Sequence, residues 1–262
     1  MKITFLSLLL TTMIVGLASC DRPVVADIVV TMFPQYDMAK AIVGDKLTVH
    51  SILPPGAEVH DFEASSQDMI TMENARLVIY TSEIIDTWMN EDTLADADTT
   101  VMNLSEYVDN HDEESFFEGS QAAEDDHEHD DIHYWVDPLV IVHLTEAILD
   151  EIVTLDPANV DFYTSNAASY IASIETAYNG FFDYLTVNSY LDATLYYAGH
   201  NALGLFATRH QFQIQALFED FKPDEDLSSA QLIDFTNEVR NTGSHYLFIE
   251  EMVYPKAATT IK

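Results

Sequence analysis

The sequence predicts an α/β fold in two lobes with parallel sheets, joined by one long helix. Near both ends of the chain, apolar runs typical of strands alternate with segments typical of helices, which is the pattern of parallel β-α units. Between these two regions, the stretch from Pro157 to Asn188 reads as one uninterrupted helix. The chain has 262 residues, 48% of them hydrophobic, which suffices for two smaller lobes with cores of their own.

The N-terminus, residues 1–19, reads as a lipoprotein signal peptide. Lys2 precedes an apolar run from Ile3 to Ala18, which is marginal for spanning a bilayer and suits the hydrophobic region of a signal peptide. The run ends in LASC, which resembles a bacterial lipobox, and Cys20 is the only cysteine in the chain. We therefore expect Cys20 to carry a lipid anchor and residues 20–26 to form an extracytoplasmic tether. An ordinary signal peptide with a chance cysteine is the alternative.

Residues 27–155 are predicted to form the N-terminal lobe. The apolar segments read as strands, and the segments with a capping serine or a terminal glycine read as helices. The predicted strands cover residues 27–33, 47–55 and 76–82, and the predicted helices cover residues 34–44, 65–75 and about 139–154.

The composition changes sharply within this lobe, from Asp109 to Asp131. This stretch has no Lys or Arg, little that could form a core, and three histidines among many carboxylates. Such a composition predicts a mobile, solvated loop.

Residues 156–188 are predicted to form a linker helix, with Asp156 as its N-cap and Pro157 at its first position. Residues 189–262 are predicted to form the C-terminal lobe. Its predicted strands cover residues 193–199 and 245–251, and its predicted helices cover residues 200–210 and 228–243.

The charge excludes some classes of partner. The chain carries 45 acidic residues against 10 Lys and Arg, for a formal net charge of -35. Nucleic acids and anionic lipid headgroups need clustered basic residues, which this chain lacks. A surface that keeps the protein soluble in a salty medium explains most of the charge.

Three of the ten histidines have similar local settings. His60 follows a predicted strand and a Pro-Pro-Gly segment, His133 lies in DIHYWVDP, and His200 follows the strand at 193–199. Three imidazoles from separate, rigid elements suit a borderline cation such as zinc. Taken singly, each is more often a strand-end polar residue bonded to the backbone. The spacing alone leaves both interpretations open.

Four separated segments carry a specific resemblance. They are similar to successive signature segments of the metal-binding lipoproteins of bacterial ABC uptake systems for zinc and manganese, in order from about Ile28 to the last residue. The resemblance implies two α/β lobes joined by a long stiff helix, with one metal ion in the cleft. His60 and His133 would be ligands from the N-terminal lobe, and His200 the first from the C-terminal lobe. The segments are PPGAEVHDFEAS, DIHYWVDP, LDPANVDFYTSNAASYIASI and AGHNALGLFATRHQF.

This family resemblance implies a carrier that binds Zn²⁺ and delivers it to an ABC permease and its ATPase, without catalysis. Manganese members often have a carboxylate where His200 stands, and nitrogen favours zinc over manganese. Acidic, histidine-containing insertions are typical of zinc members, so His127 and His129 are predicted to capture zinc at a secondary site. A solvated charged loop with incidental metal affinity is the alternative.

Two other functions stay open at this point. A manganese or iron carrier of the same family would differ only in its metal. A zinc-dependent hydrolase would use the three histidines and an activated water, with Asp61 as the proposed base. An adhesin finds no specific support in the sequence.

The sequence departs from the family pattern at its end. Members usually continue well beyond the segment that resembles FIEEMVYPKAATTIK and supply a cleft Asp from a later strand. The resemblance therefore implies a truncated C-terminus and an incomplete second lobe. We expect water, Glu58, Asp61 or Glu250 in the fourth coordination position, and a monomer in the periplasm or at the cell surface.

Carboxylates flank the predicted ligands. Asp61, Glu63 and Asp137 are each close in sequence to one of the histidines, and a carboxylate that accepts the second imidazole N–H fixes the tautomer of a ligand. Helix capping by Asp137 and surface charge at Glu63 are the alternatives.

Overall fold

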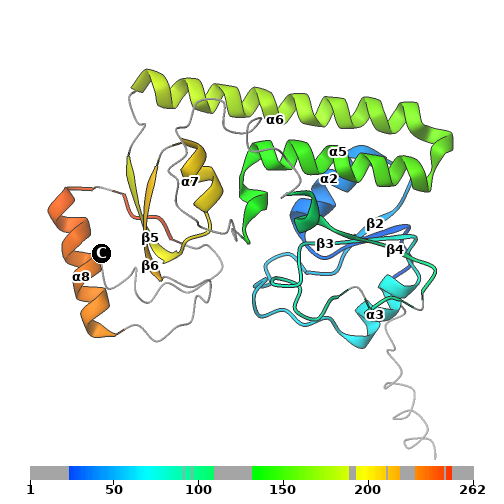
Figure 1. The fold of residues 1–262 in the computed structure, drawn as a ribbon, viewed down its shortest axis with the longest axis horizontal. Helices are drawn as coiled ribbons and strands as arrows, with labels where there is room; N and C mark the ends of the chain where they lie inside the picture. The colour runs from blue at the N-terminus through cyan, green and yellow to red at the C-terminus, as the bar shows by residue number, and fades with distance from the viewer. Residues whose placement is uncertain are drawn as a thin grey trace, which may run out of the picture.

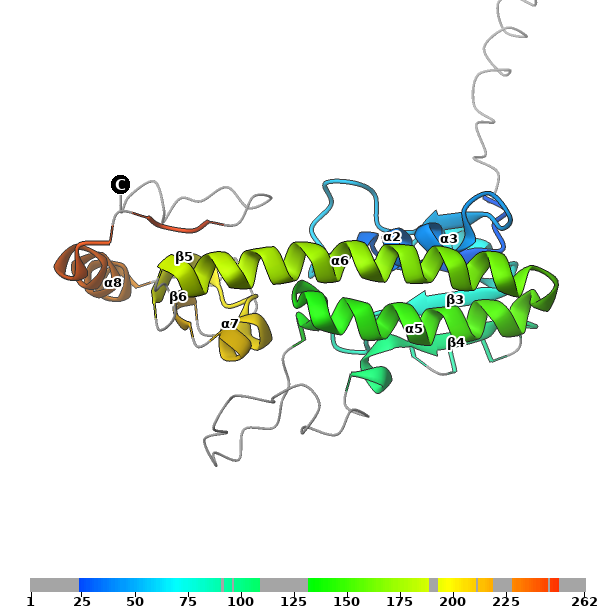
Figure 2. The same ribbon diagram turned by 90° about the horizontal axis from the view of Figure 1, so that it is seen from above.

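A computed structural model describes residues 24–90, 92–95, 97–108, 132–188, 193–210, 212–218, 228–244 and 246–249. These residues form an α/β fold with two parallel sheets and one long helix that runs along both (Figures 1 and 2). The predicted anchor Cys20, the predicted zinc-capturing His127 and His129, and Glu250 lie outside the described residues.

The first sheet has four parallel strands in the order β2-β1-β3-β4. Every residue of β1 and β3 is buried, as expected for central strands covered on both faces. Three of these strands fall within predicted ones, and β4 was not predicted. The strands are β1 (Ile28–Val30), β2 (Val49–Ser51), β3 (Leu77–Tyr80) and β4 (Thr100–Asn103).

Helices cover both faces of this sheet. Three of them, α2 (Phe33–Val43), α5 (Pro138–Leu155) and α6 (Val160–Asn188), lie on one face, and α3 (Ser66–Glu73) lies on the other (Figure 1). Because side chains alternate along a strand, Ile28 and Val30 of β1 join the core under α2 and α5, while the intervening Val29 joins the core that includes α3. We call this sheet with α2, α3 and α5 the N-terminal lobe.

The second sheet is smaller and also parallel. It pairs β5 (Thr194–His200) with β6 (Gln213–Phe218), and Phe248 adds a parallel bridge to Tyr197. Two helices, α7 (Gly204–His210) and α8 (Ser229–Thr242), accompany it. We call this part the C-terminal lobe. It differs from the prediction in three ways: β6 was not foreseen, the predicted helix at 200–210 begins only at Gly204, and the described residues of the predicted strand at 245–251 form only the bridge at Phe248.

The long helix begins differently from the prediction. The segment Pro157–Asn159 is a turn of 3-10 helix, and α6 follows it. The Asp156 side chain does not cap the backbone. It accepts hydrogen bonds from the Asn159 Nδ2 (2.8 Å) and the Tyr163 hydroxyl (2.6 Å) instead. The 3-10 first turn thus lets the Asp156 carboxylate accept hydrogen bonds from both the Asn159 and the Tyr163 side chains.

The first half of α6 is attached firmly to the N-terminal lobe. Tyr163 and Ala167 are buried in its core. Asn166 Nδ2 donates to the Ile42 carbonyl at 3.0 Å. The end of α2 is close enough for contact because Gly44, at φ +54, carries no side chain, and a Cβ there would lie 3.1 Å from the Phe162 ring. No helix in the described part of the chain is long and apolar enough to cross a membrane.

Candidate metal centre

His60 lies in the connection between β2 and α3, beyond the carboxyl end of the sheet. Pro54 and Pro55 open this connection, and Gly56 takes a φ of +85, a value that favours glycine. The backbone N–H of His60 donates to Glu58 Oε1 at 3.4 Å. The side chain of His60 is half-buried, so the loop presents it partly to solvent.

His133 is held more tightly. It is 4% exposed and immediately precedes the 3-10 turn η2 (Tyr134–Val136), which leads into α5. The hydroxyl of Tyr134 donates to the Thr81 carbonyl at 2.8 Å, and the Trp135 ring meets the His133 ring at 5.4 Å. The residues that follow His133 therefore anchor it to the end of β3.

A buried polar network supports this anchor at the point where the strand order reverses, between β1 and β3, the usual ligand position in such sheets. Asp86 Oδ2 accepts from the Thr81 backbone N–H (2.7 Å) and the Thr31 hydroxyl (3.2 Å). Burial raises the pKa of Asp86. Burial, helped by the Asp86 charge, holds the pKa of Tyr134 well above its usual value, so its hydroxyl keeps the proton that it donates. Sequence reasoning missed this network.

His200 is the last residue of β5 and is 6% exposed. It stands opposite Phe218 of β6, after an irregularity in the register between Tyr197 and His200. It was predicted at the start of a helix; it lies instead at a strand end, where the sheet fixes its backbone.

The three histidines come together. Their candidate ligand atoms all lie within 4.8 Å of one another. His133 Nε2 is 3.4 Å from His60 Nε2 and 3.1 Å from His200 Nε2. Two nitrogens bound to one tetrahedral zinc ion at its usual bond length lie about 3.3 Å apart. The two shortest separations thus match the spacing that a shared cation requires.

The chemistry of these nitrogens also fits a cation. A neutral imidazole with its proton on Nδ1 presents a lone pair at Nε2. Lone pairs that face one another repel unless a proton or a cation lies between them, and one cation satisfies all three. Among the described residues this is the one such group of histidine, cysteine and carboxylate ligands.

Asp137 caps α5 and forms an ion pair with an arginine of the other lobe. Its Oδ1 accepts from the Leu139 backbone N–H at 2.8 Å, which caps α5. Its Oδ2 accepts from Arg209 Nε of α7 at 2.7 Å. The capping role is therefore confirmed, and the ion pair with Arg209 is a contact that the sequence did not indicate. Asp61 and Glu63 are exposed.

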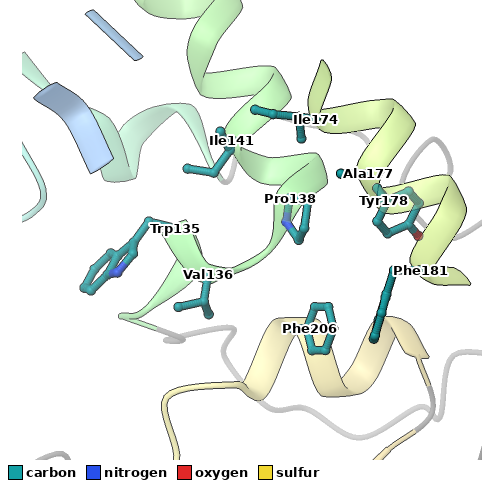
Figure 3. A pocket seen from close by; sticks show the side chains of 9 residues that line it. All are labelled: Trp135, Val136, Pro138, Ile141, Ile174, Ala177, Tyr178, Phe181 and Phe206. Atoms are coloured by element: carbon teal, nitrogen blue, oxygen red, sulfur yellow. The ribbon is translucent and has the colours of Figure 1, made fainter. Parts of the chain in front are cut away.

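An apolar cavity of about 430 Å³ lies beside this ion pair, between the start of α5, the second half of α6, and α7 (Figure 3). Trp135 and Pro138 line one side, Ile174 and Phe181 of α6 the next, and Phe206 of α7 a third. The two lobes thus meet here along an apolar pocket, where Leu205 of α7 packs against the core of the N-terminal lobe.

His210, at the end of α7, is a buried histidine outside the cluster. It is 1% exposed, and neither ring nitrogen has a hydrogen-bond partner in the described structure. Aromatic rings surround it, with Phe206 at 4.6 Å and Tyr178 at 5.5 Å between centroids. Burial lowers the pKa of His210, so a neutral ring fits this apolar setting.

Two parallel sheets on one 29-residue helix, with buried imidazoles from both lobes facing one another, define the class: a metal-binding protein of the solute-binding type. The family profile described as zinc-uptake complex component A, periplasmic (ZnuA), matches residues 28–262. The chain belongs to this family, whose members are transport components and not enzymes.

Individual relatives agree with this assignment. The high-affinity zinc uptake system protein ZnuA of Bacillus subtilis (strain 168) is 26% identical over 247 residues, which cover 89% of this chain and 73% of that protein. The zinc-binding lipoprotein AdcA of Streptococcus pneumoniae (strain ATCC BAA-255 / R6) is 26% identical over 259 residues. That match covers 94% of this chain, which spans about half (50%) of that relative's length.

A solved structure shares the fold. The laminin binding protein Lmb of Streptococcus agalactiae, described as a bifunctional protein with adhesin and metal transporting activity, superimposes with a TM-score of 0.71. The two chains are 24% identical, and the superposition covers 89% of this chain and 83% of that one.

Proposed function

We propose that this protein captures Zn²⁺ outside the cytoplasm with His60, His133 and His200 and delivers it to an ABC permease and its ATPase. The observation that carries the proposal is the convergence of the three side chains, with Nε2 separations of 3.1 and 3.4 Å. The ion is cargo: it is bound and released, and no bond of a substrate is broken.

Zinc is the metal that this set of ligands favours. Three neutral nitrogens suit zinc better than the harder manganese, which prefers oxygen ligands. Water, Glu58 or Asp61 would complete a tetrahedral site. Glu58 stands close by, since one of its carboxylate oxygens already accepts from the backbone of His60.

The distribution of the three ligands over two lobes explains how the zinc ion would be released. The N-terminal lobe supplies His60 and His133, and the C-terminal lobe supplies His200. Any separation of the lobes therefore withdraws one of three protein ligands from the ion. The metal site thus lies in an interlobe cleft whose opening frees the cargo.

Location and accessory binding complete the proposal. Cys20 is the lipid anchor that keeps a monomer at the outer side of a bacterial membrane, and His127 and His129 capture zinc at a secondary site. The lipobox supports the first statement, as does the lipoprotein among the relatives. The acidic, histidine-containing composition of residues 109–131 supports the second.

A competitive titration tests the main proposal. Zinc and manganese compete for the purified protein, its His133→Ala variant, a deletion of residues 109–131, and a matched control, His50→Ala. His50 lies on β2, outside the cluster. We expect tight one-to-one zinc binding that is lost in His133→Ala alone. Weak, multiple zinc binding that vanishes with the deletion would contradict the proposal, and a preference for manganese would correct the metal.

Acid should weaken zinc binding, because imidazole must lose its proton to become a ligand. We expect zinc affinity to fall steeply below about pH 6, near the ordinary pKa of histidine. The titration repeated between pH 7.5 and 5 measures this. An affinity that stays flat over that range would exclude histidine ligation, and esterase or phosphatase turnover that His60→Ala abolishes would favour a hydrolase.

A further inference from the structure

The cation site needs something to set the distance between His133 and His200, because these residues belong to different lobes. The linker α6 joins the lobes along one side of the molecule (Figure 1). Near the start of α5, α7 contacts η2, and Leu205 of α7 packs against the core of the N-terminal lobe, beside an apolar pocket of about 430 Å³ (Figure 3). These apolar contacts hold the lobes together without fixing a direction, because burial of apolar surface is non-directional.

The ion pair between Asp137 and Arg209 also links the two lobes. Arg209 Nε lies 2.7 Å from Asp137 Oδ2. Asp137 follows His133 by four residues, across η2, and Arg209 belongs to α7, which begins at Gly204, four residues after the end of β5 at His200. Each partner is thus joined to one of the two predicted ligands through a short, structured segment.

Burial shields this ion pair from solvent. The Asp137 side chain is fully buried and that of Arg209 is 9% exposed, so water and salt screen the attraction little. The other carboxylate oxygen of Asp137 is held by the backbone of α5. Because guanidinium is a planar donor, the pair fixes the direction of α7 as well as its distance.

We propose that Arg209 is a positioning residue for cation binding: its ion pair with Asp137 holds α7, and with it His200, within coordinating distance of His133. The pair then sets how long the cleft retains its cargo. This inference rests on the proposed function, because it concerns the same histidines.

A double variant separates positioning from stability. Arg209→Met leaves a buried carboxylate without its cation, which destabilises a protein strongly. Asp137→Asn removes that charge while its side-chain oxygen can still cap α5. The combination D137N/R209M therefore has no unpaired buried charge, yet it lacks the directional link between the lobes.

The experiment compares the purified wild-type protein with R209M, D137N, D137N/R209M and a matched control, R240M. Arg240 is an exposed residue of α8. For each protein, zinc dissociation is timed after an excess of chelator is added. Thermal unfolding is followed without metal, and the absorption spectrum is recorded with Co²⁺ in place of zinc.

We expect R209M to lose both thermal stability and zinc retention. In D137N/R209M the unfolding temperature returns toward the wild-type value, whereas zinc still dissociates about tenfold faster, the size of a coupling between neighbouring groups. Its Co²⁺ spectrum also differs from that of the wild type, because the ligand geometry has changed. R240M behaves as wild type in every measurement.

Zinc dissociation from D137N/R209M at the wild-type rate would overturn the inference, as would zinc retention that recovers in step with stability. These outcomes leave the proposed function intact, because the wild type and R240M still bind one zinc ion. Failure of the wild type itself to bind zinc would overturn the proposed function and this inference together.

Discussion

The two ends of α6 are attached to the rest of the molecule in different ways. At its start, Tyr163 and Ala167 are buried in the main core, and Tyr170 donates to Asp37 of α2 at 2.7 Å. At its end, Phe181 and Phe182 remain 38% and 40% exposed. The first end is held by burial and directional hydrogen bonds. The second buries Leu185 with Ala207 and Phe212 and otherwise meets α7 through aromatic contacts beside an open pocket.

This difference indicates which lobe can move. Burial together with hydrogen bonds fixes both position and direction, so the N-terminal lobe and α6 should behave as one body. Apolar contacts are non-directional and therefore allow several arrangements of similar energy. We therefore expect motion between the lobes to concentrate at the C-terminal end of α6, displacing His200 while His60 and His133 keep their places.

The largest expected loss of stability tests the N-terminal end of α6, which is attached more firmly. Tyr163→Ala removes a fully buried ring and its hydrogen bond to Asp156, and a cavity of this size costs about 3–5 kcal/mol of unfolding free energy. Denaturant unfolding of the metal-free protein measures it. A loss below about 1 kcal/mol would mean that this end is no more firmly attached than the other.

Phe181→Ala is the matched substitution at the loose end. Because the ring is already partly exposed and lines a cavity, we expect a loss of about 1–2 kcal/mol. We also expect zinc to dissociate faster from this variant than from Tyr163→Ala, although Phe181→Ala unfolds at higher denaturant. Equal losses of stability in the two variants would erase the contrast between the ends.

His210→Phe should change how protein stability depends on pH, and it tests the contacts of α7 with the C-terminal end of α6. Asp137, Arg209 and Tyr178 are the charged or titratable groups that act with His210. Because burial lowers the pKa of His210, the unfolded chain takes up a proton near pH 6.5 that the folded protein does not. Wild-type stability should therefore fall, relative to His210→Phe, as pH decreases from 7.5 to 5.5.

At pH 7.5 the same variant should be about 1 kcal/mol more stable than the wild type, because an unpaired polar group leaves the interior. Thermal unfolding of the wild-type protein and of His210→Phe, with chelator present and between pH 7.5 and 5.5, measures the difference in stability at pH 7.5 and its change with pH. A difference that does not change with pH would show that His210 is not shielded from solvent as the structure has it.

The smallest expected effect is that of Tyr170→Phe. It removes one exposed hydrogen bond, to Asp37, and should cost about 0.5–1 kcal/mol. Denaturant unfolding measures it, with Tyr184→Phe, an exposed tyrosine farther along α6, as the control. A cost as large as that of Tyr163→Ala would assign the rigid attachment to this bond and not to burial.

Much of the fold could be predicted from apolar patterns, and the two missed strands show the limit. In β4, TVMN, only Met102 is buried, and in β6, QIQALF, two glutamines alternate with apolar residues. Both lie at the edge of their sheet. Such short, half-polar segments owe their conformation to the neighbouring strand, which a local pattern does not reveal.

The candidate site divides in the same way. Turn residues and strand ends singled out His60, His133 and His200, but their convergence depends on contacts between residues 67 and 73 positions apart. The capping role of Asp137 was readable from the proline that follows it. Its partner Arg209, 72 positions away, was not, because no local rule relates a helix cap in one lobe to a guanidinium in the other.

The unequal exposure of the three histidines has a consequence for metal exchange at the site. His133 and His200 are buried, whereas His60 is half-buried on its loop. Of the three described rings, that of His60 is therefore the one most accessible to solvent. We expect a cation or a chelator that arrives from solvent to meet this ring first. The loop that begins with Pro54 and Pro55 carries this ligand, so its stiffness should influence the rate of metal exchange.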